Sequence, residues 1–469
     1  MSDLSNACAP GIDAPMPAAN RFAMVAVMLA VALATLDTAI ANTALPAIAT
    51  ALHATPAESV WIVNGYQLAM VATILPFAAL GDVFGHRRVY IGGLALFTAA
   101  SLACAAAPTL PLLTAARLLQ GLGGSAITSV SIALVSALYP RHRLGRGVGV
   151  NALVVGVSVA VGPTIASLIL STASWSWLFI INVPLGVIAL VFALPVLPQT
   201  PRGAHPLDPV AAVLNVITFA SLIVALGEGG QRAPTIRVLG ALVITLVFGV
   251  CLMRREATRL APMLPVDLFR RPEFALSAVT AVCAFAAQGF AFVSLPFYFE
   301  DALHLSQMET GFLITPWPVV VALVAPVAGR LSDRYPPGAL GAAGLACLCA
   351  GLVSLSLLPA HPSVYAIAVR MAICGVGFGL FQSPNIKALM ASAPHARSGG
   401  ASGVVATSRL IGQATGAALV ALCFGLAGQH GPILALLGGA IFAGIGGIAS
   451  GLRLMARSHR LGSAGWADR

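Results

Sequence analysis

Residues 33–46 read LATLDTAIANTALP and place a single carboxylate, Asp37, inside a long apolar run. The run covers residues 22–48, which exceeds the about 20 apolar residues that a helix needs to cross the hydrocarbon core of a bilayer. A charge at that depth costs a few kcal/mol, so an ionisable residue that remains there indicates a functional site. The stretch therefore predicts a membrane-spanning helix with Asp37 near its middle.

The same apolar pattern extends over the whole chain of 469 residues, of which 58% are hydrophobic and 9% charged. A soluble protein cannot bury that much apolar surface, and lipid offers the backbone no partner outside its own helix. We therefore expect an all-α integral membrane protein with fourteen spans, at residues 22–48, 57–80, 88–107, 110–138, 147–170, 176–197, 207–228, 236–253, 273–299, 307–330, 338–358, 362–391, 399–427 and 431–456.

The basic residues gather in alternate connections between these spans. The connections on the other side hold only Arg232 and Arg237. Because basic loops stay in the cytoplasm, both termini are predicted there, and the net charge of +10 needs no nucleic-acid partner. The residues on the predicted cytoplasmic side are Arg21, Arg87, Arg88, Arg141, Arg143, Arg146, Arg202, Arg254, Arg255, Arg259, Arg270, Arg271, Arg330, Arg334, Arg397, Arg453, Arg457, Arg460 and Arg469.

The chain repeats itself at an offset of about 251 residues. Asp82 in LGD corresponds to Asp333 in LSD, Pro46 to Pro296, Arg117 to Arg370 and Arg146 to Arg397. Repeated halves of this kind build transporters and enclose the substrate site near the middle of the membrane. We expect a cytoplasmic tail at 1–21, a six-helix half at 22–200, two inserted helices within 201–260, a second six-helix half at 261–456 and a tail at 457–469.

Two carboxylates have a local explanation. TPAE at 55–58 and SQME at 306–309 both have the capping-box pattern, with a hydroxyl residue three positions before Glu58 or Glu309. We expect these residues to cap helices at the predicted outer surface, and a proton or cation role is the alternative.

Several short motifs occur in order along the chain and resemble those of the major facilitator superfamily, in particular its 14-spanner drug:proton antiporter branch. They include LDTAIANTALP, LGDVFGHRRV, RLLQGLGG, VSVAVGP, WSWLFIINVPLG, GRLSDR and SGVVATSRLIGQATGAAL. The resemblance implies the major facilitator fold, alternating access, a proton gradient as the energy source and no cofactor.

The resemblance also assigns a conformational latch to the loop after the second span. A short acidic residue there can accept hydrogen bonds from a helix N-terminus of the other half, with arginines nearby. The alternative is a basic cytoplasmic loop with a turn glycine. The latch residues are Asp82, Gly85, Arg87 and Arg88, with Asp333 and Arg334 in the second copy.

In the fifth span, Gly162 and Pro163 match the family's antiporter motif, although Ala166 and Ser167 replace two of its glycines. Small residues and a proline are expected to allow close helix approach between the halves and a bend.

Asp37 is the candidate proton site, with Arg117 as its partner. A carboxylate buried alone favours its protonated form and one beside a cation its ionised form, so movement between these settings would carry a proton. The alternative is a permanent ion pair that holds the helices together. Arginine keeps its proton, so Arg117 tunes Asp37 or pairs with substrate.

Polar and aromatic residues at similar depth predict an amphipathic substrate cavity, although each one alone also suits interhelical packing. They are Asn42, Asn64, Gln67, Gln288, Phe292, Trp317, Arg370, Gln382, Asn385 and Arg409, while Lys387 is expected to be structural.

Together these features predict a proton-coupled exporter of small amphipathic or drug-like compounds, a monomer in a bacterial inner membrane without metal or nucleic-acid partners. The alternatives are a facilitator or proton symporter for a metabolite, and, in another class, a membrane-embedded sensor or enzyme. None of the nine His lies in a clear acid–base or metal constellation within the spans, which argues against an enzyme.

Overall fold

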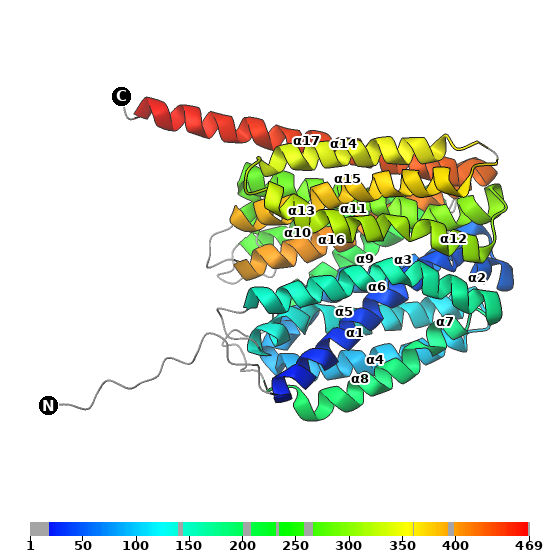
Figure 1. The fold of residues 1–469 in the computed structure, drawn as a ribbon. Helices are drawn as coiled ribbons and strands as arrows, with labels where there is room; N and C mark the ends of the chain where they lie inside the picture. Colours follow the sequence, from blue (N-terminus) through cyan, green and yellow to red (C-terminus); the bar gives the residue numbers. More distant parts are fainter. Residues whose placement is uncertain are drawn as a thin grey trace.

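Long helices that run side by side make up the protein (Figure 1). The computed structural model describes residues 18–138, 144–199, 208–230, 234–257, 266–359, 361–392 and 398–467. Within these ranges every regular element is a helix, which confirms the predicted all-α class. Most of the predicted N-terminal tail and the basic residues Arg141, Arg143, Arg202, Arg259 and Arg397 lie outside the described residues, as does Arg232.

The first bundle is built around α1, which contacts α5, α6 and α8. In this bundle α5 also packs along α3 and α4. Its helices are α1 (Ala18–Thr43), α2 (Leu45–Ala51), α3 (Pro56–Phe84), α4 (His86–Ala105), α5 (Leu110–Leu138), α6 (Leu144–Thr172), α7 (Trp177–Ile180) and α8 (Asn182–Val196).

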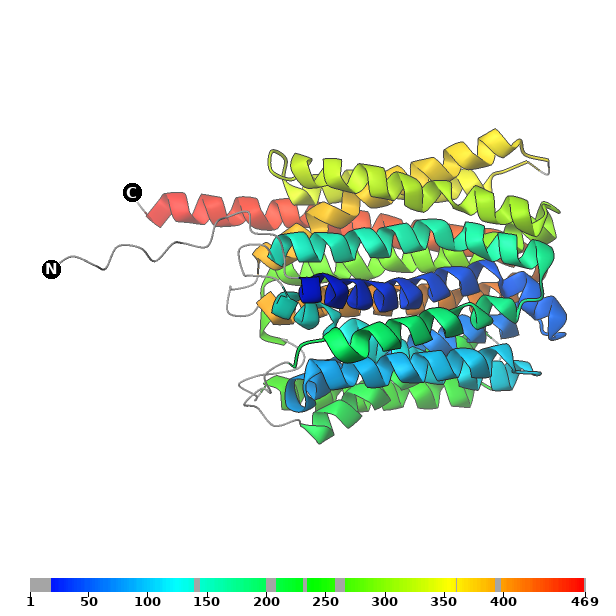
Figure 2. The ribbon, with the colours of Figure 1, turned by 60° about the horizontal axis from the view of Figure 1, so that its bottom comes forward.

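The second bundle is built around α11, which packs against α16 and α17, and between the bundles α9 packs on α3 and α16. Figure 2 shows the two groups of helices side by side from another direction. The elements are α9 (Pro209–Gly230), α10 (Thr235–Ala257), η2 (Val266–Arg270), α11 (Pro272–Phe297), η3 (Tyr298–Ala302, a π-helical turn), α12 (Gln307–Ile314), α13 (Pro316–Leu331), α14 (Pro337–Ser356), α15 (Val364–Ala391), α16 (Ser398–Ala427), η5 (Gly428–His430) and α17 (Gly431–Ala467).

The described residues contain thirteen helical stretches that are long and apolar enough to cross a membrane. The last stretch, Gly403–Leu454, has 52 residues and combines α16 with α17. These two helices contact each other and are joined by η5, where Gly428 adopts a φ of 53° that only glycine takes easily. Counted separately, α16 and α17 bring the spanning helices to the fourteen that the sequence predicts.

The first predicted span is wrong at its end. Residues 22–48 do not form one helix, since α1 ends at Thr43 and α2 begins at Leu45 with Pro46 in its first turn. The repeat does not copy this break, because Pro296 lies inside α11 and is followed by the π-helical turn η3. A proline removes a backbone donor, and the two halves accommodate the missing bond in different ways.

Both predicted capping boxes are confirmed. The Thr55 backbone N–H donates to Glu58 Oε2 at 2.8 Å, and the Glu58 N–H donates to Thr55 Oγ1 at 3.3 Å. Ser306 and Glu309 form the same pair of bonds at 2.8 and 3.3 Å. Helix capping therefore accounts for both carboxylates.

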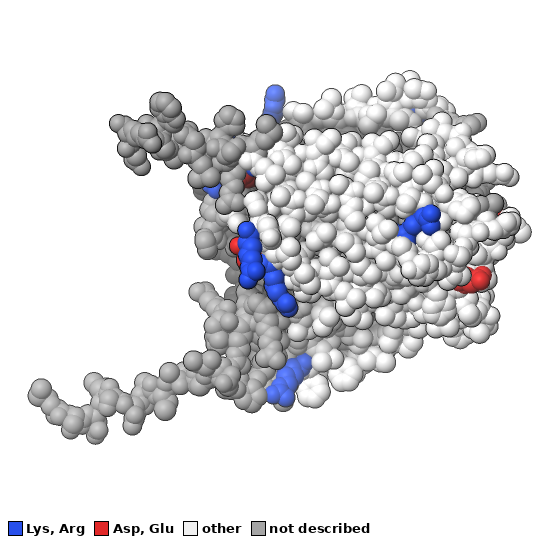
Figure 3. Space-filling view, turned by 45° about the horizontal axis from the view of Figure 1, so that its top comes forward, with Lys and Arg blue, Asp and Glu red and all other residues white. Residues whose placement is uncertain are grey.

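Charged side chains are sparse on the flank of the molecule, and lysines and arginines gather near the end at which α1 begins (Figures 1 and 3). We call this the basic end and the other the far end. Exposed apolar residues such as Ile236, Leu246, Leu323 and Ile448 cover much of the flank. A flank of this kind suits contact with lipid.

The two bundles pack tightly toward the far end. Ile40, Leu45 and Ile48 of the first bundle share one buried cluster with Phe297 and Phe424 of the second. In the same region, α6 packs against α12.

Gly311 on α12 permits this approach. A Cβ atom added there would lie 2.5 Å from the carbonyl oxygen of Pro163 on α6 and would overlap Ser167 Oγ. The hydroxyls of Thr164 and Thr315 hydrogen-bond across the same interface at 2.9 Å. Close packing of this kind holds helices together in lipid, where apolar burial gives no net drive.

Substitution Gly311→Ala is expected to separate α6 from α12 at the far end, because the added methyl group costs about 1–3 kcal/mol of overpacking. A cysteine introduced by Thr164→Cys should then react faster with a membrane-impermeant maleimide than it does in the parent protein. Gly329→Ala is the matched control, since the nearest atom to its added methyl group is 3.9 Å away. Equal labelling in all three backgrounds would show that Gly311 does not set this contact.

Candidate functional site: a buried ion pair at the centre of the first bundle

The structure brings Asp37 of α1 together with Arg117 of α5, as the sequence predicts. Arg117 Nη1 donates to Asp37 Oδ2 at 2.5 Å, and each residue is only 1% exposed. Asp37 lies well inside α1, and Arg117 lies two turns into α5. The pair is therefore a contact between two helices of the first bundle, and it is shielded from both water and lipid.

Two amides complete the coordination of the carboxylate. Asp37 Oδ1 accepts from Gln120 Nε2 at 2.9 Å and from Asn182 Nδ2 at 2.7 Å. Gln120 also donates to Ser101 Oγ of α4 at 2.9 Å. These bonds connect α1, α4, α5 and α8 in one network around the carboxylate.

The guanidinium of Arg117 is equally enclosed. Its Nε donates to the Ile62 carbonyl of α3 at 3.2 Å, and its Nη1 donates to Gln120 Oε1 at 2.6 Å. The ring of Tyr66 lies 4.3 Å from the guanidinium carbon, and the ring of Phe179 lies 5.6 Å from it. The aromatic faces stabilise the cation and exclude water from the pair.

Gln120 and Asn182 are not among the site residues predicted from the sequence. Both nevertheless lie inside family motifs, RLLQGLGG and WSWLFIINVPLG. Gln120 follows Arg117 by three residues and so shares its helix face, which the spacing alone could have indicated. Asn182 is 145 residues from Asp37, and no local signal connects them.

At the positions of the second copy that correspond to Arg117 and Asp37, Arg370 and Gln288 form no ion pair with a described residue. Arg370, which corresponds to Arg117, donates to the carbonyl oxygens of Ser354 and Ala366, both at 3.0 Å. In the second bundle Gln288 corresponds to Asp37 and accepts a hydrogen bond from Gln413 at 3.1 Å. The charged centre therefore belongs to the first bundle.

The remaining predicted cavity residues fall into separate places. Phe292 and Trp317 have their ring centroids 5.2 Å apart. Asn64 is fully buried, and its amide has no hydrogen-bond partner among the described residues; the same holds for the Trp317 indole N–H and for Asn42 Oδ1. Gln67 is buried on α3, and Gln382 on α15 is half-buried.

Asn385 has a different setting from the one predicted. It donates to the Ser277 carbonyl at 3.1 Å and accepts from Arg453 Nη1 at 2.7 Å. Arg453 also donates to the hydroxyls of Ser277 and Ser450. This polar cluster connects α11, α15 and α17 near the basic end and is separate from the Asp37–Arg117 pair.

Three of the six predicted latch residues, Asp82, Arg87 and Asp333, have partners within their own bundles. His86 Nε2 lies 3.1 Å from Asp82 Oδ1, and Arg87 donates to the Leu194 carbonyl at 2.5 Å. In the second copy Asp333 pairs with Lys387, whereas Arg88 and Arg334 are exposed. Gly85, between α3 and α4, has a φ of 94°, which explains why a glycine stands there.

In the α6 motif the two predicted residues contact different partners. Gly162 faces Ala39 of α1 so closely that an added Cβ would overlap the Ala39 methyl. The Pro163 carbonyl faces Gly311 of the other bundle. Gly162 therefore serves packing within its own bundle, and the approach between bundles uses Pro163 and Ser167.

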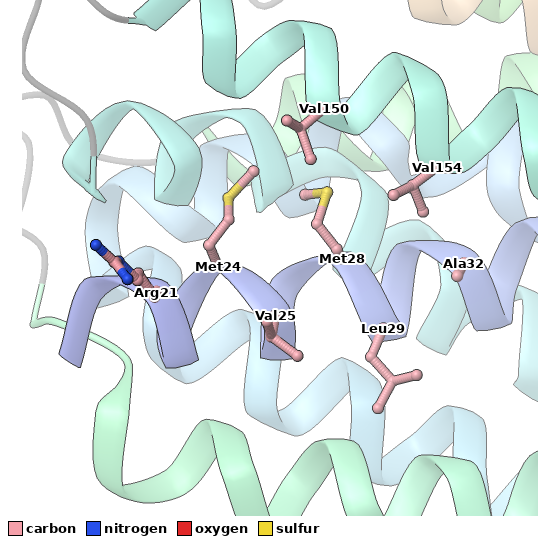
Figure 4. A pocket seen from close by; sticks show the side chains of 8 residues that line it. All are labelled: Arg21, Met24, Val25, Met28, Leu29, Ala32, Val150 and Val154. Carbon is pink, nitrogen blue, oxygen red and sulfur yellow. The ribbon is translucent and has the colours of Figure 1, made fainter. Parts of the chain in front are cut away.

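A groove of about 470 Å³ lies apart from the ion pair, between α1 and α6 near the basic end (Figure 4). Figure 4 shows Met24 and Met28 of α1 directed toward Val150 and Val154 of α6. Val25, also in the lining, is 59% exposed, so the groove is on the surface. Its lining contains none of the predicted proton or substrate residues.

Removing one member of the Asp37–Arg117 pair is expected to destabilise the protein by about 3–5 kcal/mol, because the other charge stays buried without a partner. Removing both charges in the double variant Asp37→Asn/Arg117→Gln should recover most of that loss. Thermal unfolding in detergent, followed by intrinsic tryptophan fluorescence, measures the cycle.

The conservative substitution Glu228→Gln is the control, since Glu228 lies 3.7 Å from Arg237, whose side chain is 61% exposed. It should change stability by less than about 1 kcal/mol. Additive losses in the double variant would contradict a direct energetic coupling between Asp37 and Arg117.

Comparison with known proteins identifies the family of this chain. Residues 27–417 match the model of the Major Facilitator Superfamily. The transporter YebQ of Escherichia coli K12 is 50% identical over 442 residues, which cover 94% of this chain and 97% of YebQ.

Two further relatives have names that state a cargo or a phenotype. The riboflavin transporter RibZ of Clostridioides difficile is 30% identical and is matched over 86% of this chain and 87% of RibZ. The multidrug resistance protein Stp of Mycobacterium tuberculosis (strain CDC 1551 / Oshkosh) is 32% identical, over 82% of this chain and 72% of Stp.

Solved structures agree on the fold. A crystal structure of a POT family transporter in complex with a thioalcohol-conjugated peptide has a TM-score of 0.73 at 14% identity, covering 93% of this chain and 96% of that one. The resemblance seen in the sequence motifs is confirmed, and the chain is a multi-pass membrane transport protein and not an enzyme. It belongs to the Major Facilitator Superfamily.

Proposed function

We propose that this transporter is a proton-coupled exporter of small amphipathic or drug-like compounds. The observation that carries the proposal is the enclosed Asp37–Arg117 pair in the middle of the first bundle. Among the described residues, Asp37 is the buried carboxylate that lies at mid-helix, whereas buried Glu256 lies at the end of α10. The names of relatives such as the multidrug resistance protein Stp support export of drug-like compounds.

The pair gives a physical route from proton binding to conformational change. In the arrangement described here Asp37 accepts hydrogen bonds from Arg117, Gln120 and Asn182. Protonation of the carboxylate would remove its charge and one acceptor position, which weakens the connection of α1 to α5 and α8. Proton binding therefore favours a different packing of the first bundle, and the substrate would bias the same equilibrium.

The energy source in this proposal is the proton gradient. A proton that moves inward contributes about 2.3 kcal/mol for each 100 mV of membrane potential. The halves 22–200 and 261–456 would alternate around a central substrate site, with the helices of 201–260 beside them. The latch residues Asp82 and Asp333 would exchange their present partners, His86 and Lys387, for partners in the opposite half during that motion.

We place the protein, as a monomer, in the inner membrane of a bacterium with both termini in the cytoplasm. The basic end carries the arginines that the positive-inside rule assigns to the cytoplasm, among them Arg87, Arg254 and Arg330. The far end then faces outward, and the tight packing of Gly311 against α6 closes the outer side.

A second candidate is a facilitator or proton symporter for a metabolite. It is favoured by the relative RibZ, whose name states riboflavin as its cargo. A symporter would move protons and substrate in the same direction, and a facilitator would move substrate without protons, whereas the proposed exporter moves them in opposite directions.

Reconstitution into proteoliposomes with an imposed pH gradient tests the proposal, with ethidium, rhodamine 6G and riboflavin as probes and pyranine inside to report pH. The intact protein should move probe and protons in opposite directions. In Asp37→Asn, gradient-driven accumulation should fall at least tenfold while exchange down a probe gradient continues, and Asp37→Glu should keep part of the coupling because the carboxylate remains.

Glu228→Gln serves again as the control and should transport as the parent does. Movement of probe and protons in the same direction would support the symporter instead. Unchanged pH dependence in a folded Asp37→Asn protein would assign the ion pair a purely structural role.

A further inference from the structure

Arg409 on α16 stands apart from the other arginines inside the helices. It is half-buried, and it has no hydrogen bond or ion pair with any residue that the structure describes. By contrast, Arg117 pairs with Asp37, Arg370 donates to two carbonyls, and Arg453 donates to Ser277 and Asn385. An arginine within the hydrocarbon region is costly and is found facing a water-filled or ligand-binding space.

The packing of α16 shows where this side chain points. Gly412 and Gly416 lie against the backbone of α11, with Val282 O 2.5 Å from the position of a Cβ at Gly412. Leu410 and Ala414 belong to a buried cluster with residues of the first bundle. At 3.6 residues per turn, Arg409 lies on the face between these two directions, between α11 and the first bundle.

Two neighbours support this placement. Gln413, one turn after Arg409, donates to Gln288 of α11. The helix that carries Arg409, α16, also packs directly against α3, which carries Tyr66. Tyr66 in turn covers the guanidinium of Arg117 at 4.3 Å. Arg409 therefore lies at the interface of the two bundles, on a helix that packs against the helix of Tyr66.

We propose that Arg409 binds the anionic group of the exported substrate, so that the preferred cargo is an amphipathic compound with a carboxylate or a similar acid. This inference rests on the proposed export function and specifies its substrate class. Arginine presents a planar array of donors that matches a carboxylate, and the match is strongest where water is excluded. Arg117 cannot take this role while Asp37 neutralises it.

An anionic cargo is also compatible with the energetics of export. An anion that leaves and a proton that enters move charge in the same sense across the membrane. An inside-negative potential therefore drives both movements, at about 2.3 kcal/mol per charge for each 100 mV. Coupling between anion export and proton entry would depend on how the bundles pack. The anion and the proton would not compete for the same charged residue.

Binding of two related dyes to the purified full chain in detergent tests the inference by fluorescence anisotropy. Fluorescein carries a free carboxylate, whereas rhodamine 6G has a similar xanthene core, an esterified carboxyl group and a positive charge. The parent protein should bind fluorescein more tightly than rhodamine 6G. Arg409→Gln should weaken fluorescein binding about tenfold or more, which corresponds to loss of one charge-assisted hydrogen bond.

Two further variants separate recognition from folding. Arg409→Lys keeps the positive charge and should retain a large part of the preference for fluorescein, with some loss because the planar array of donors is gone. Arg237→Gln makes the same chemical change at an exposed arginine and should bind both dyes as the parent does.

Equal binding of fluorescein by the parent and by folded Arg409→Gln would overturn the inference, as would tighter binding of rhodamine 6G by the parent. Transport of both dyes in proteoliposomes then separates the two proposals. Gradient-driven export that is indifferent to Arg409 leaves the export function in place and rejects the anion site. Binding that depends on Arg409 without gradient-driven export supports the anion site and rejects proton-coupled export.

Discussion

The rest of this structure depends on the pairing of one carboxylate with one guanidinium inside a membrane bundle. Neither charge is tolerable alone at that depth, so each requires the other, and the geometry of the pair fixes the helices that carry them. Asp37 is further held by amides from two helices, and Arg117 by a carbonyl and two aromatic rings. Six helices of the first bundle, α1, α3, α4, α5, α7 and α8, are thereby positioned around a single interaction.

The contact between the bundles rests on a different principle. It uses small residues and shape, as at Gly311 against the Pro163 carbonyl. In lipid such surfaces hold together by close packing and can separate without exposing charge. A rigid polar centre within one bundle and a packed apolar contact between bundles are a suitable combination for alternating access.

The two halves share ancestry in sequence but not chemistry. Arg117 and Arg370 occupy corresponding positions, yet Arg117 pairs with a carboxylate and Arg370 with carbonyl oxygens. Arg409 adds a third setting, at the bundle interface. In our proposals this asymmetry assigns different roles to the halves: the first half carries the proton-binding carboxylate, and the second half contributes the cation that binds the substrate.

The sequence by itself determined the properties that depend on local chemistry. Apolar runs predicted the spans because lipid permits only internally bonded helices. The capping boxes at Thr55 and Ser306 were predictable because both partners lie within four residues. The motifs identified the family, and the pairing of Asp37 with Arg117 was predicted from their burial and opposite charge together with the resemblance to the family, in which the first and fourth spans line the cavity. Only the tertiary structure decided what depends on distant contacts: the amides of Gln120 and Asn182 on Asp37, the engagement of Asn385 by Arg453, and the different outcomes at Pro46 and Pro296. A hydrogen bond between helices depends on how they rotate and approach each other, and that is set by the packing of all the helices together.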